Sequence, residues 1–254
     1  MSRKFYVVWE GREKGIFTDW DSCRRQVEKF AGAKYKSYKS RAEAEAAYRA
    51  GYKKPAPKSK TAPKKSRAGG LKTLSAAEIA ALDVATTIFT DGGCEPNPGK
   101  AASGLAVYRE GAVEELYYGL FNPQGTNNTA ELNALHQALL MAEKEIATGS
   151  SVAILCDSSY SIQCVTKWAA GWEKRGWKKK DGEIKNLEVI QKMYALYNKV
   201  KSSVQVLHVN GHVGVEGNEL ADRMSIHGIE TRQEDFVPFE IPADLKEILK
   251  MRAG

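Results

Sequence analysis

The pattern of hydrophobic and polar positions in residues 1–52 predicts a small domain with the order strand, strand, helix, strand, helix. In chain order, these elements are expected at residues 4–10, 16–18, 21–29, 34–39 and 41–50. Fifty residues is small for a stable domain but sufficient with this many aromatic side chains. In the third strand, lysines and tyrosines alternate in a way that places basic and aromatic side chains on one surface. Such a surface is typical of proteins that bind a nucleic acid duplex.

Residues 84–230 show the pattern of a larger α/β domain. A β-branched strand is expected over residues 86–90, and the continuous apolar run over residues 151–156 predicts a central strand buried on both faces. Residues 128–147 are expected to form a helix, because Leu and other apolar residues recur there every three or four positions. The remaining predicted elements are a hairpin of strands 103–109 and 113–120, helices over 158–168 and 183–199, a strand over 204–209 and a helix from about residue 217.

A stretch rich in lysine and proline separates these two domains. Residues 53–72 show no apolar periodicity, which predicts a mobile linker. Ser75 and Glu78 have the spacing of a helix capping box, so a short helix is expected at its end. The sequence thus predicts four parts, at residues 1–52, 53–83, 84–230 and 231–254. Residues 231–254 are expected to form an extended piece followed by a short helix, and they suggest no function.

Charge is distributed unevenly over these parts. The chain carries a net charge of +7, made up of +5 in residues 1–52, +8 in residues 53–72 and −6 in the remainder. A basic front fits a polyanionic partner such as nucleic acid, with solubility as the alternative explanation. A hydrophobic content of 43% beside 27% charged residues excludes a membrane protein and a wholly disordered chain.

No segment of the sequence predicts export or membrane insertion. The first apolar run, residues 5–9, is too short for a signal peptide, and no window approaches the roughly 18 apolar residues of a spanning helix. The four cysteines are far apart, which indicates neither a disulfide framework nor a zinc site. A zinc pair of His208 and His212 is not expected either, since the first lies in a predicted strand. We therefore expect a cytoplasmic protein with reduced thiols and no membrane partner.

Four carboxylates are candidates for catalysis or metal binding. Asp91 and Asp157 each follow an apolar strand, at the edge where α/β sheets gather their ligands. Glu131 lies in the first turns of the long predicted helix, and Asp222 lies in the last one. An acid after a strand is more often a turn former or a helix cap, so position alone leaves both interpretations open. Four converging oxygen donors would suit Mg²⁺ or Mn²⁺ and would repel one another without a cation.

The sequences around these acids resemble those of ribonuclease HI. The matching motifs are TDGGCEPNPG at 90–99, TNNTAEL at 126–132, LCDS at 155–158 and GHxxxxGNELADR at 211–223, in the order of that family. The resemblance implies an α/β fold with a five-stranded mixed sheet flanked by helices. It also implies hydrolysis of the RNA strand of RNA–DNA hybrids to 5′-phosphate and 3′-hydroxyl ends. It assigns two Mg²⁺ ions, replaceable by Mn²⁺, to Asp91, Glu131, Asp157 and Asp222. His212 is implied to handle protons or to assist product release.

The same resemblance implies contacts with nucleic acid. Asn97, Asn127 and Asn128 match residues that sense the RNA minor groove, where 2′-hydroxyls distinguish RNA from DNA. Trp168 matches a residue that contacts deoxyribose and begins a basic stretch, residues 168–180, that resembles the handle gripping the DNA strand.

A pocket for one DNA phosphate is implied as well. Thr126 and Asn186 match its residues. Gln124 stands where relatives with a hybrid-binding domain often have arginine, which predicts a weaker pocket.

The front domain resembles the hybrid-binding domain of ribonucleases H1. The matching motifs are FYVV at 5–8, GRxxGIF at 11–17, TxWxxC at 18–23, VxxF at 27–30 and YKxY at 35–38. The resemblance implies that Trp20 and Lys36, with Tyr35 beside them, contact the backbones of a hybrid duplex. Ser37 stands where the family often has a second lysine, so one phosphate contact is in doubt. Double-stranded RNA stays open as a second ligand of this domain.

We therefore expect a monomeric, metal-dependent endonuclease whose front domain binds the hybrid and aids repeated cutting. One alternative is a hybrid-binding protein with a decayed nuclease, against which the intact set of four carboxylates argues. A second alternative is a nuclease or integrase of the same fold that acts on DNA, against which the front domain and the Asn127–Asn128 pair argue. The Gly99–Lys100 pair does not form a phosphate loop, because Cys94 and Ala101 stand at positions that need glycine and Ser or Thr. No nucleotide cofactor is expected.

Overall fold

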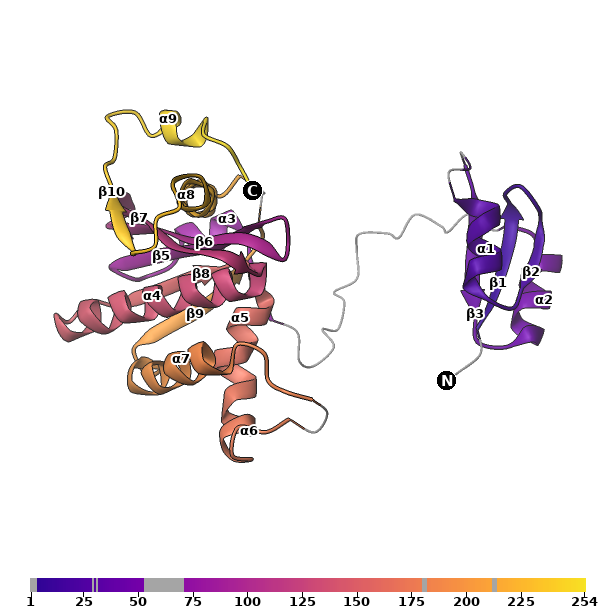
Figure 1. The fold of residues 1–254 in the computed structure, drawn as a ribbon, viewed down its shortest axis with the longest axis horizontal. Coiled ribbons are helices and arrows are strands. Elements are labelled where there is room, and N and C mark those ends of the chain that lie inside the picture. The colour runs from indigo at the N-terminus through magenta and orange to yellow at the C-terminus, as the bar shows by residue number, and fades with distance from the viewer. Residues whose placement is uncertain (1–3, 29, 31, 53–70, 180–181, 212–213) are drawn as a thin grey trace. The chain divides into compact units, whose positions relative to one another are not determined.

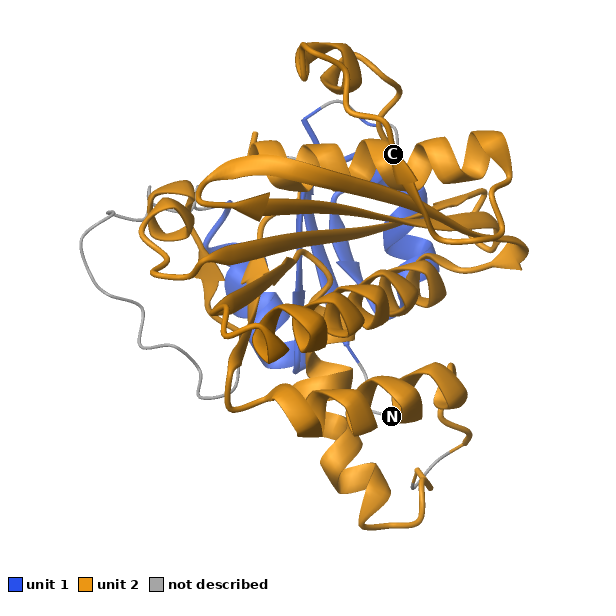
Figure 2. Ribbon diagram, turned by 90° about the vertical axis from the view of Figure 1, so that its left-hand side faces the viewer, with its two compact units in different colours: residues 1–66 blue, residues 67–254 orange. Residues whose placement is uncertain are grey.

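The computed structural model comprises two compact units, residues 1–66 and residues 67–254 (Figure 2). It describes residues 4–28, 30, 32–52, 71–179, 182–211 and 214–254. His212 and most of the predicted linker therefore lie outside the described residues. Within the described ranges, no helix is long and apolar enough to cross a membrane.

The first unit is a three-stranded antiparallel sheet with two helices, in the predicted order (Figure 1). Its elements are β1 (Phe5–Glu10), β2 (Gly15–Phe17), α1 (Trp20–Val27), β3 (Lys34–Tyr38) and α2 (Arg41–Arg49). The central strand β1 pairs with both others. Side chains of Asp19 and Ser40 cap the two helices by accepting hydrogen bonds from backbone N–H groups. The small core of this unit includes the fully buried Val7, Val8 and Cys23.

A mixed sheet forms the centre of the second unit, with the order β10-β7-β6-β5-β8-β9-β4. Its strands are β4 (Thr73–Leu74), β5 (Thr86–Glu95), β6 (Gly99–Arg109), β7 (Ala112–Gly125), β8 (Val152–Cys156), β9 (Val204–Val209) and β10 (Val237–Phe239). The strands from β10 to β5 are antiparallel neighbours, whereas β5, β8, β9 and β4 run parallel. The expected mixed sheet is confirmed, but it has seven strands among the described residues rather than five. The two additional strands, β4 and β10, are short and lie at the sheet edges.

Helices cover both faces of this sheet (Figure 1). They are α3 (Ala76–Ala80), α4 (Asn127–Ala147), α5 (Ser159–Gln163), a π-helical turn (Cys164–Trp168), α6 (Ala169–Glu173), α7 (Leu187–Val200), α8 (Glu216–Thr231) and α9 (Lys246–Leu249). Helices α4 and α7 share one hydrophobic cluster with the sheet, and α8 and α9 share another. The capping box of Ser75 and Glu78 begins α3, as predicted.

Successive residues of the central strands reach opposite faces. In β5, Ile88 joins the cluster under α4 whereas Phe89 joins the cluster under α8, and Ile154 and Leu155 of β8 divide in the same way. All five residues of β8 are buried. This double burial explains why the sequence of β8 is continuously apolar rather than alternating.

Several boundaries differ from the sequence predictions. The hairpin strands β6 and β7 extend to Gly99 and Gly125, beyond the predicted limits of 103 and 120. Strand β5 continues beyond residue 90, because its last residues pair with the start of β6, so Asp91 lies inside a strand and not after one. The helix expected over 158–168 is interrupted by the π-helical turn and continues to Glu173. Helix α7 begins at Leu187 and not at residue 183, because Asn186 adopts a left-handed backbone with φ of 59°.

Candidate active site

The four carboxylates singled out in the sequence lie around one pocket of about 180 Å³. Asp91 is on β5, Glu131 is in the second turn of α4, and Asp222 is on α8. Asp157 directly follows β8, and Thr90 and Cys156 are the last paired residues of the parallel strands β5 and β8. Asp91 and Asp157 therefore follow equivalent positions of neighbouring strands, which explains why residues 66 positions apart line the same pocket.

Two glycines allow the helices to come close enough to complete this pocket. A Cβ atom on Gly92 would lie 2.3 Å from the backbone nitrogen of Glu131, so a larger residue there would push α4 away from β5. A Cβ atom on Gly104 would lie 2.2 Å from the backbone oxygen of Ala221, next to Asp222 on α8. The close approach of α4 and α8 to the sheet thus depends on missing side chains.

Three of the four carboxylates are buried. Asp91 and Glu131 are each 8% exposed, and Asp222 is 3% exposed. The backbone N–H of Gly92 donates to Asp91 Oδ1 at 2.7 Å, and Asn127 Nδ2 donates to Glu131 Oε1 at 3.0 Å. Glu131 Oε2 has no hydrogen-bond partner among the described residues.

Burial and mutual repulsion shift the ionisation of two of these groups. The pKa of Asp91 is raised well above its ordinary value, mainly by burial and then by the nearby charges of Asp157, Glu131 and Asp222. Burial, followed by the charge of Asp157, raises the pKa of Glu131 to about 8. Raised pKa values on neighbouring carboxyls show that the pocket lacks enough positive charge to compensate its carboxylates.

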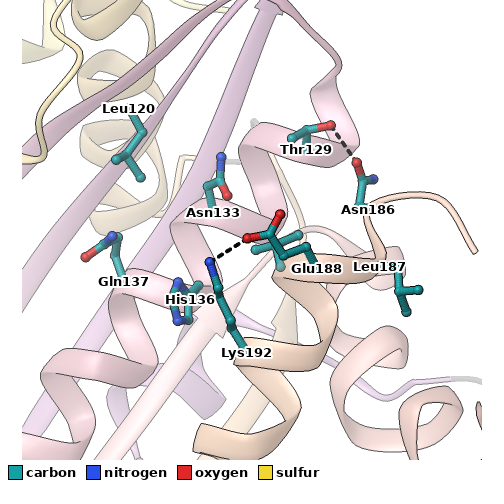
Figure 3. Close-up of a pocket in the computed structure, with 10 residues that line it drawn as sticks. Leu120, Thr129, Asn133, His136, Gln137, Asn186, Leu187, Glu188 and Lys192 are labelled. Carbon is teal, nitrogen blue, oxygen red and sulfur yellow. Dashed lines mark hydrogen bonds and ion pairs between the residues drawn. The ribbon is translucent and has the colours of Figure 1, made fainter. Parts of the chain in front are cut away.

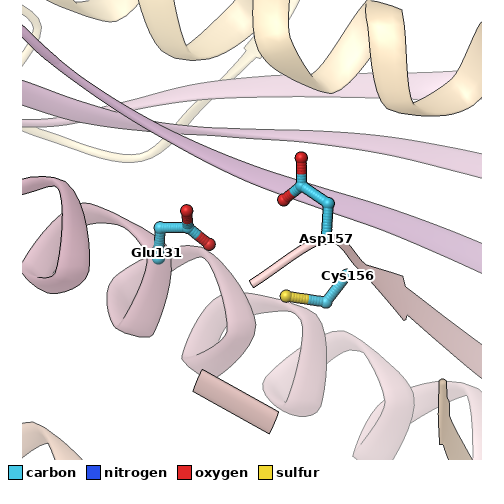
Figure 4. Close-up of side chains that lie close together, drawn as sticks. All are labelled: Glu131, Cys156 and Asp157. Carbon is cyan, nitrogen blue, oxygen red and sulfur yellow. The ribbon is translucent and has the colours of Figure 1, made fainter. Parts of the chain in front are cut away.

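Such a pocket has the chemistry of a divalent cation site. Ligand atoms of Glu131, Cys156 and Asp157 all lie within 4.8 Å of one another (Figure 4). Oxygen donors of this kind suit Mg²⁺ or Mn²⁺. Burial raises the pKa of the Cys156 thiol, which keeps the thiol neutral and leaves the carboxylates as the charged ligands. The unpartnered Glu131 oxygen and the raised pKa values of Asp91 and Glu131 fit a bound cation.

An asparagine pair lies directly beside the carboxylates. Asn97 Oδ1 accepts a hydrogen bond from the backbone N–H of Asn127 at 3.3 Å, and Asn127 in turn donates its side-chain amide to Glu131. Asn127 also lines the carboxylate pocket. The structure therefore brings the predicted minor-groove residues Asn97 and Asn127 together with the predicted metal ligands.

Thr126 and Asn186 are connected through a residue that the sequence did not reveal. Thr126 caps α4, and its hydroxyl lies 2.8 Å from the hydroxyl of Thr129. Thr129 in turn donates to Asn186 Oδ1 at 2.9 Å (Figure 3). Thr129 and Asn186 line a pocket of about 480 Å³ together with Lys192 and His136. Thr129 belongs to the TNNTAEL motif, and this was the one sequence feature that could have pointed to it. Its contact with Asn186 depends on the tertiary structure, which the motif does not reveal.

Asn128 and Trp168 line a separate groove of about 490 Å³. Trp168 packs against Trp172 and Tyr160, with ring centroids 5.9 and 6.0 Å apart. Lys179 and Lys185 also line this groove. An aromatic wall flanked by lysines suits a sugar–phosphate chain.

The first unit presents a row of aromatic rings on its surface. The Trp20 ring lies between Tyr6 and Tyr35, at centroid distances of 5.5 and 5.9 Å. Trp20 is 41% exposed and Tyr35 is 44% exposed, so neither is a core residue. Lys36 is exposed on the neighbouring position of β3 and lies over the ring of Tyr38. The three residues predicted for duplex binding thus share β3 and the start of α1.

Two contacts at the carboxylate pocket were not foreseen. His208 lies between two partners, with Nε2 3.0 Å from the backbone oxygen of Asp157 and Nδ1 2.8 Å from the hydroxyl of Thr73. The backbone N–H of Gly254 donates to both oxygens of Asp222. No local sequence signal indicates either contact, because each joins segments far apart in the chain.

Comparisons with known proteins agree with this architecture. The "RNase H" family model matches residues 83–230, and the "Ribonuclease H1 N-terminal domain" model matches residues 4–48. Ribonuclease H1 of Rattus norvegicus is 30% identical over 257 residues, which cover 88% of this chain and 88% of that protein. Ribonuclease H of Methylorubrum extorquens is 36% identical over 143 residues, and the match covers 56% of this chain and 59% of that protein.

One solved structure extends the comparison to the fold. LC9-RNase H1, titled a type 1 RNase H with the type 2 active-site motif, superposes with a TM-score of 0.52 at 23% identity, covering 66% of this chain and 85% of its own. The two family models match in tandem, and a relative aligns along most of both chains. The four carboxylates around one pocket agree with this. The chain belongs to the ribonuclease H family and carries a ribonuclease H1 N-terminal domain ahead of its RNase H domain.

Proposed function

We propose that this protein is an endonuclease that hydrolyses the RNA strand of RNA–DNA hybrids with the help of two divalent metal ions, Mg²⁺ in the first place. The observation that carries the proposal is the pocket that Asp91, Glu131, Asp157 and Asp222 share. Gathering four acids around one pocket, three of them buried, is unfavourable unless a cation compensates them. The match of the RNase H family model to residues 83–230, a range that contains all four acids, supports the same assignment.

The chain's own residues hold and orient the reacting groups. When bound, two divalent ions would activate a water on one side of the phosphorus and stabilise the departing 3′ oxygen on the other, which leaves 5′-phosphate and 3′-hydroxyl ends. The Gly92 N–H fixes the orientation of Asp91, and the Asn127 side chain fixes that of Glu131. Arg223, which is paired with Asp222, limits the negative charge at that side of the pocket.

Selection of a hybrid follows from groups on two sides of the pocket. Asn97, Asn127 and Asn128 would read 2′-hydroxyls of the RNA strand, since amide groups both donate and accept hydrogen bonds. The hydroxyls and amide of Thr126, Thr129 and Asn186 would hold a phosphate of the DNA strand, with Trp168 against a deoxyribose. Gln124 is exposed and lacks the charge of arginine, so this phosphate site should be weak.

Residues 4–52 would bind the hybrid independently of its sequence. The exposed rings of Trp20 and Tyr35 offer stacking or sugar contacts, and Lys36, at the next position of β3, would supply a phosphate partner. We divide the chain into residues 1–52, 53–83, 84–230 and 231–254. Attachment of the first domain to the nuclease would raise the local concentration of hybrid and favour repeated cutting.

The decisive experiment is cleavage of labelled substrates. The purified chain is incubated with RNA–DNA hybrid, double-stranded RNA and double-stranded DNA, each with Mg²⁺ or with EDTA. We expect cleavage of the RNA strand of the hybrid alone, and only with Mg²⁺. Binding of the hybrid without any cleavage would instead favour a non-catalytic hybrid-binding protein.

A further inference from the structure

A segment outside the RNase H family match reaches into the carboxylate pocket. Residues 252–254 follow α9, whereas the match to the family model ends at residue 230. Gly254 is one of the residues that line the pocket of about 180 Å³. Its backbone N–H lies 3.1 Å from Asp222 Oδ1 and 3.3 Å from Asp222 Oδ2. We refer to residues 252–254 as the strap.

The strap is anchored on both sides of the pocket. Arg252 forms an ion pair with Glu95 on β5, and its other guanidinium nitrogen lies 3.6 Å from Glu230 on α8. Preceding it, Ile248 is 1% exposed and Met251 packs against the hydrophobic cluster under α8. The anchor at α9 is therefore apolar and firm, whereas the strap itself is held by the two half-exposed ion pairs of Arg252 and by one N–H group. Exposed ion pairs contribute little, so the strap can leave the pocket without unfolding α9.

We propose that the strap and a divalent cation compete for Asp222, so that the docked strap restrains the nuclease and metal binding releases it. This inference rests on the proposed metal-dependent function. Asp222 already accepts hydrogen bonds from Arg223 and from Gly254. A cation at this carboxylate would compete with the Gly254 N–H, because Arg223 already occupies Oδ2 and the strap lies against both oxygens from the pocket side.

Steric room leads to the same conclusion. A Cβ atom on Gly254 would lie 2.7 Å from Asp222 Oδ1 and 3.3 Å from Cδ1 of Ile226. A side chain at residue 254 would therefore press on the Asp222 carboxylate and weaken this docking. A pocket of this size has little room for the strap together with a hydrated cation and a scissile phosphate.

Competition of this kind is reciprocal. If the strap weakens cation binding by some factor, a saturating cation must weaken strap docking by the same factor. A charge-assisted hydrogen bond of the Gly254 type supports an effect of about tenfold.

Two variants and one control test the proposal by a binding measurement. Deletion of residues 252–254 removes the strap, and Gly254→Val keeps its length but prevents close docking on Asp222. Lys250→Ala removes one positive charge from an exposed position near the strap and serves as the control. Mn²⁺ binding is measured from the electron paramagnetic resonance of the free ion. We expect a dissociation constant about tenfold lower for the deletion and for Gly254→Val than for the full chain, and no change for Lys250→Ala.

A second readout follows the strap itself in the full chain. The amide resonance of Gly254 in a ¹H–¹⁵N spectrum should move to the position of an unstructured chain when Mg²⁺ is added. Two results would contradict the proposed competition while leaving the nuclease assignment intact. One is unchanged or weaker Mn²⁺ binding in the deletion variant, and the other is a Gly254 resonance that does not move when Mg²⁺ is added. Absence of Mn²⁺ binding in all four proteins would overturn the proposed function, and the strap with it.

Discussion

Replacing Glu131 by glutamine should stabilise the metal-free protein at neutral pH while it removes cleavage. The side chain is 8% exposed, and its Oε2 atom has no hydrogen-bond partner among the described residues. Glutamine keeps the acceptor that Asn127 uses and carries no charge. The substitution therefore relieves repulsion in the pocket but loses a metal ligand.

The size of this effect follows from the raised pKa. Glu131 has an ordinary value of 4.5, and burial together with Asp157 raises its pKa to about 8. At pH 7 the unfolded chain carries an ionised glutamate, whereas the folded chain must take up a proton. This costs about 1.4 kcal/mol per pH unit above 4.5, or about 3 kcal/mol at pH 7. Because protons redistribute among the neighbouring carboxyls, we expect a gain of about 1–3 kcal/mol for Glu131→Gln.

The stability of the metal-free protein should fall as pH rises from 4.5 to 8. Between pH 4.5 and 8 the folded protein binds more protons at this site than the unfolded chain, so stability falls as pH rises. The advantage of Glu131→Gln should therefore be near zero at pH 4.5 and grow up to about pH 8. Urea unfolding in EDTA at pH 4.5, 6 and 7.5 measures it. Glu143→Gln, on the same helix but half-exposed and paired with Lys199, is the matched control and should change stability by less than about 1 kcal/mol.

Addition of Mg²⁺ provides a further comparison. The original protein should gain stability with Mg²⁺, and the variant should gain much less. A Glu131→Gln protein that is less stable than the original at pH 7.5 in EDTA would refute the reasoning, because it would mean that the pocket tolerates its charges without a cation.

Three other perturbations examine separate parts of the proposal. Asp157→Asn should reduce hybrid cleavage to background while binding in a gel-shift assay persists, and full activity in this variant would count against its role as a metal ligand. Trp20→Ala should weaken hybrid binding by about tenfold in filter binding, with the affinity of the first unit also falling about tenfold or more between 50 and 200 mM salt; a salt-independent affinity would indicate a different surface. Deletion of residues 1–70 should weaken binding and repeated cutting but leave a Mg²⁺-dependent nuclease, and an inactive remainder would contradict the modular division.

Regular elements with a strong periodic pattern were predictable from the sequence. Helix α4 begins at Asn127 instead of residue 128, and strand β8 lies within the predicted run, because burial on defined faces imposes the apolar spacing. The edge strands β4 and β10 contain only two and three residues; β4 carries no such pattern, whereas β10 lies within the extended piece expected in residues 231–254. They form because β9 and β7 offer them hydrogen-bonding partners.

The chemistry of the site was predictable where it resides in motifs and not where it depends on tertiary contacts. The motifs marked Asp91 and Asp157, although Gly92 and Gly93 suggested a turn where β5 in fact continues against β6. By contrast, the hydrogen bond of Thr129 to Asn186 spans 57 positions, and that of Gly254 to Asp222 spans 32. Each depends on how helices pack against the sheet, which no local pattern encodes.

The central claim is that the four-carboxylate pocket acts through divalent cations on RNA paired with DNA. Its most direct test is a cleavage time course on an end-labelled RNA–DNA hybrid with Mg²⁺, with EDTA, and with EDTA followed by excess Mg²⁺. The proposal predicts cuts in the RNA strand with Mg²⁺, none with EDTA, and recovery when Mg²⁺ is restored. Cleavage that proceeds in EDTA, or cuts in the DNA strand, would contradict it.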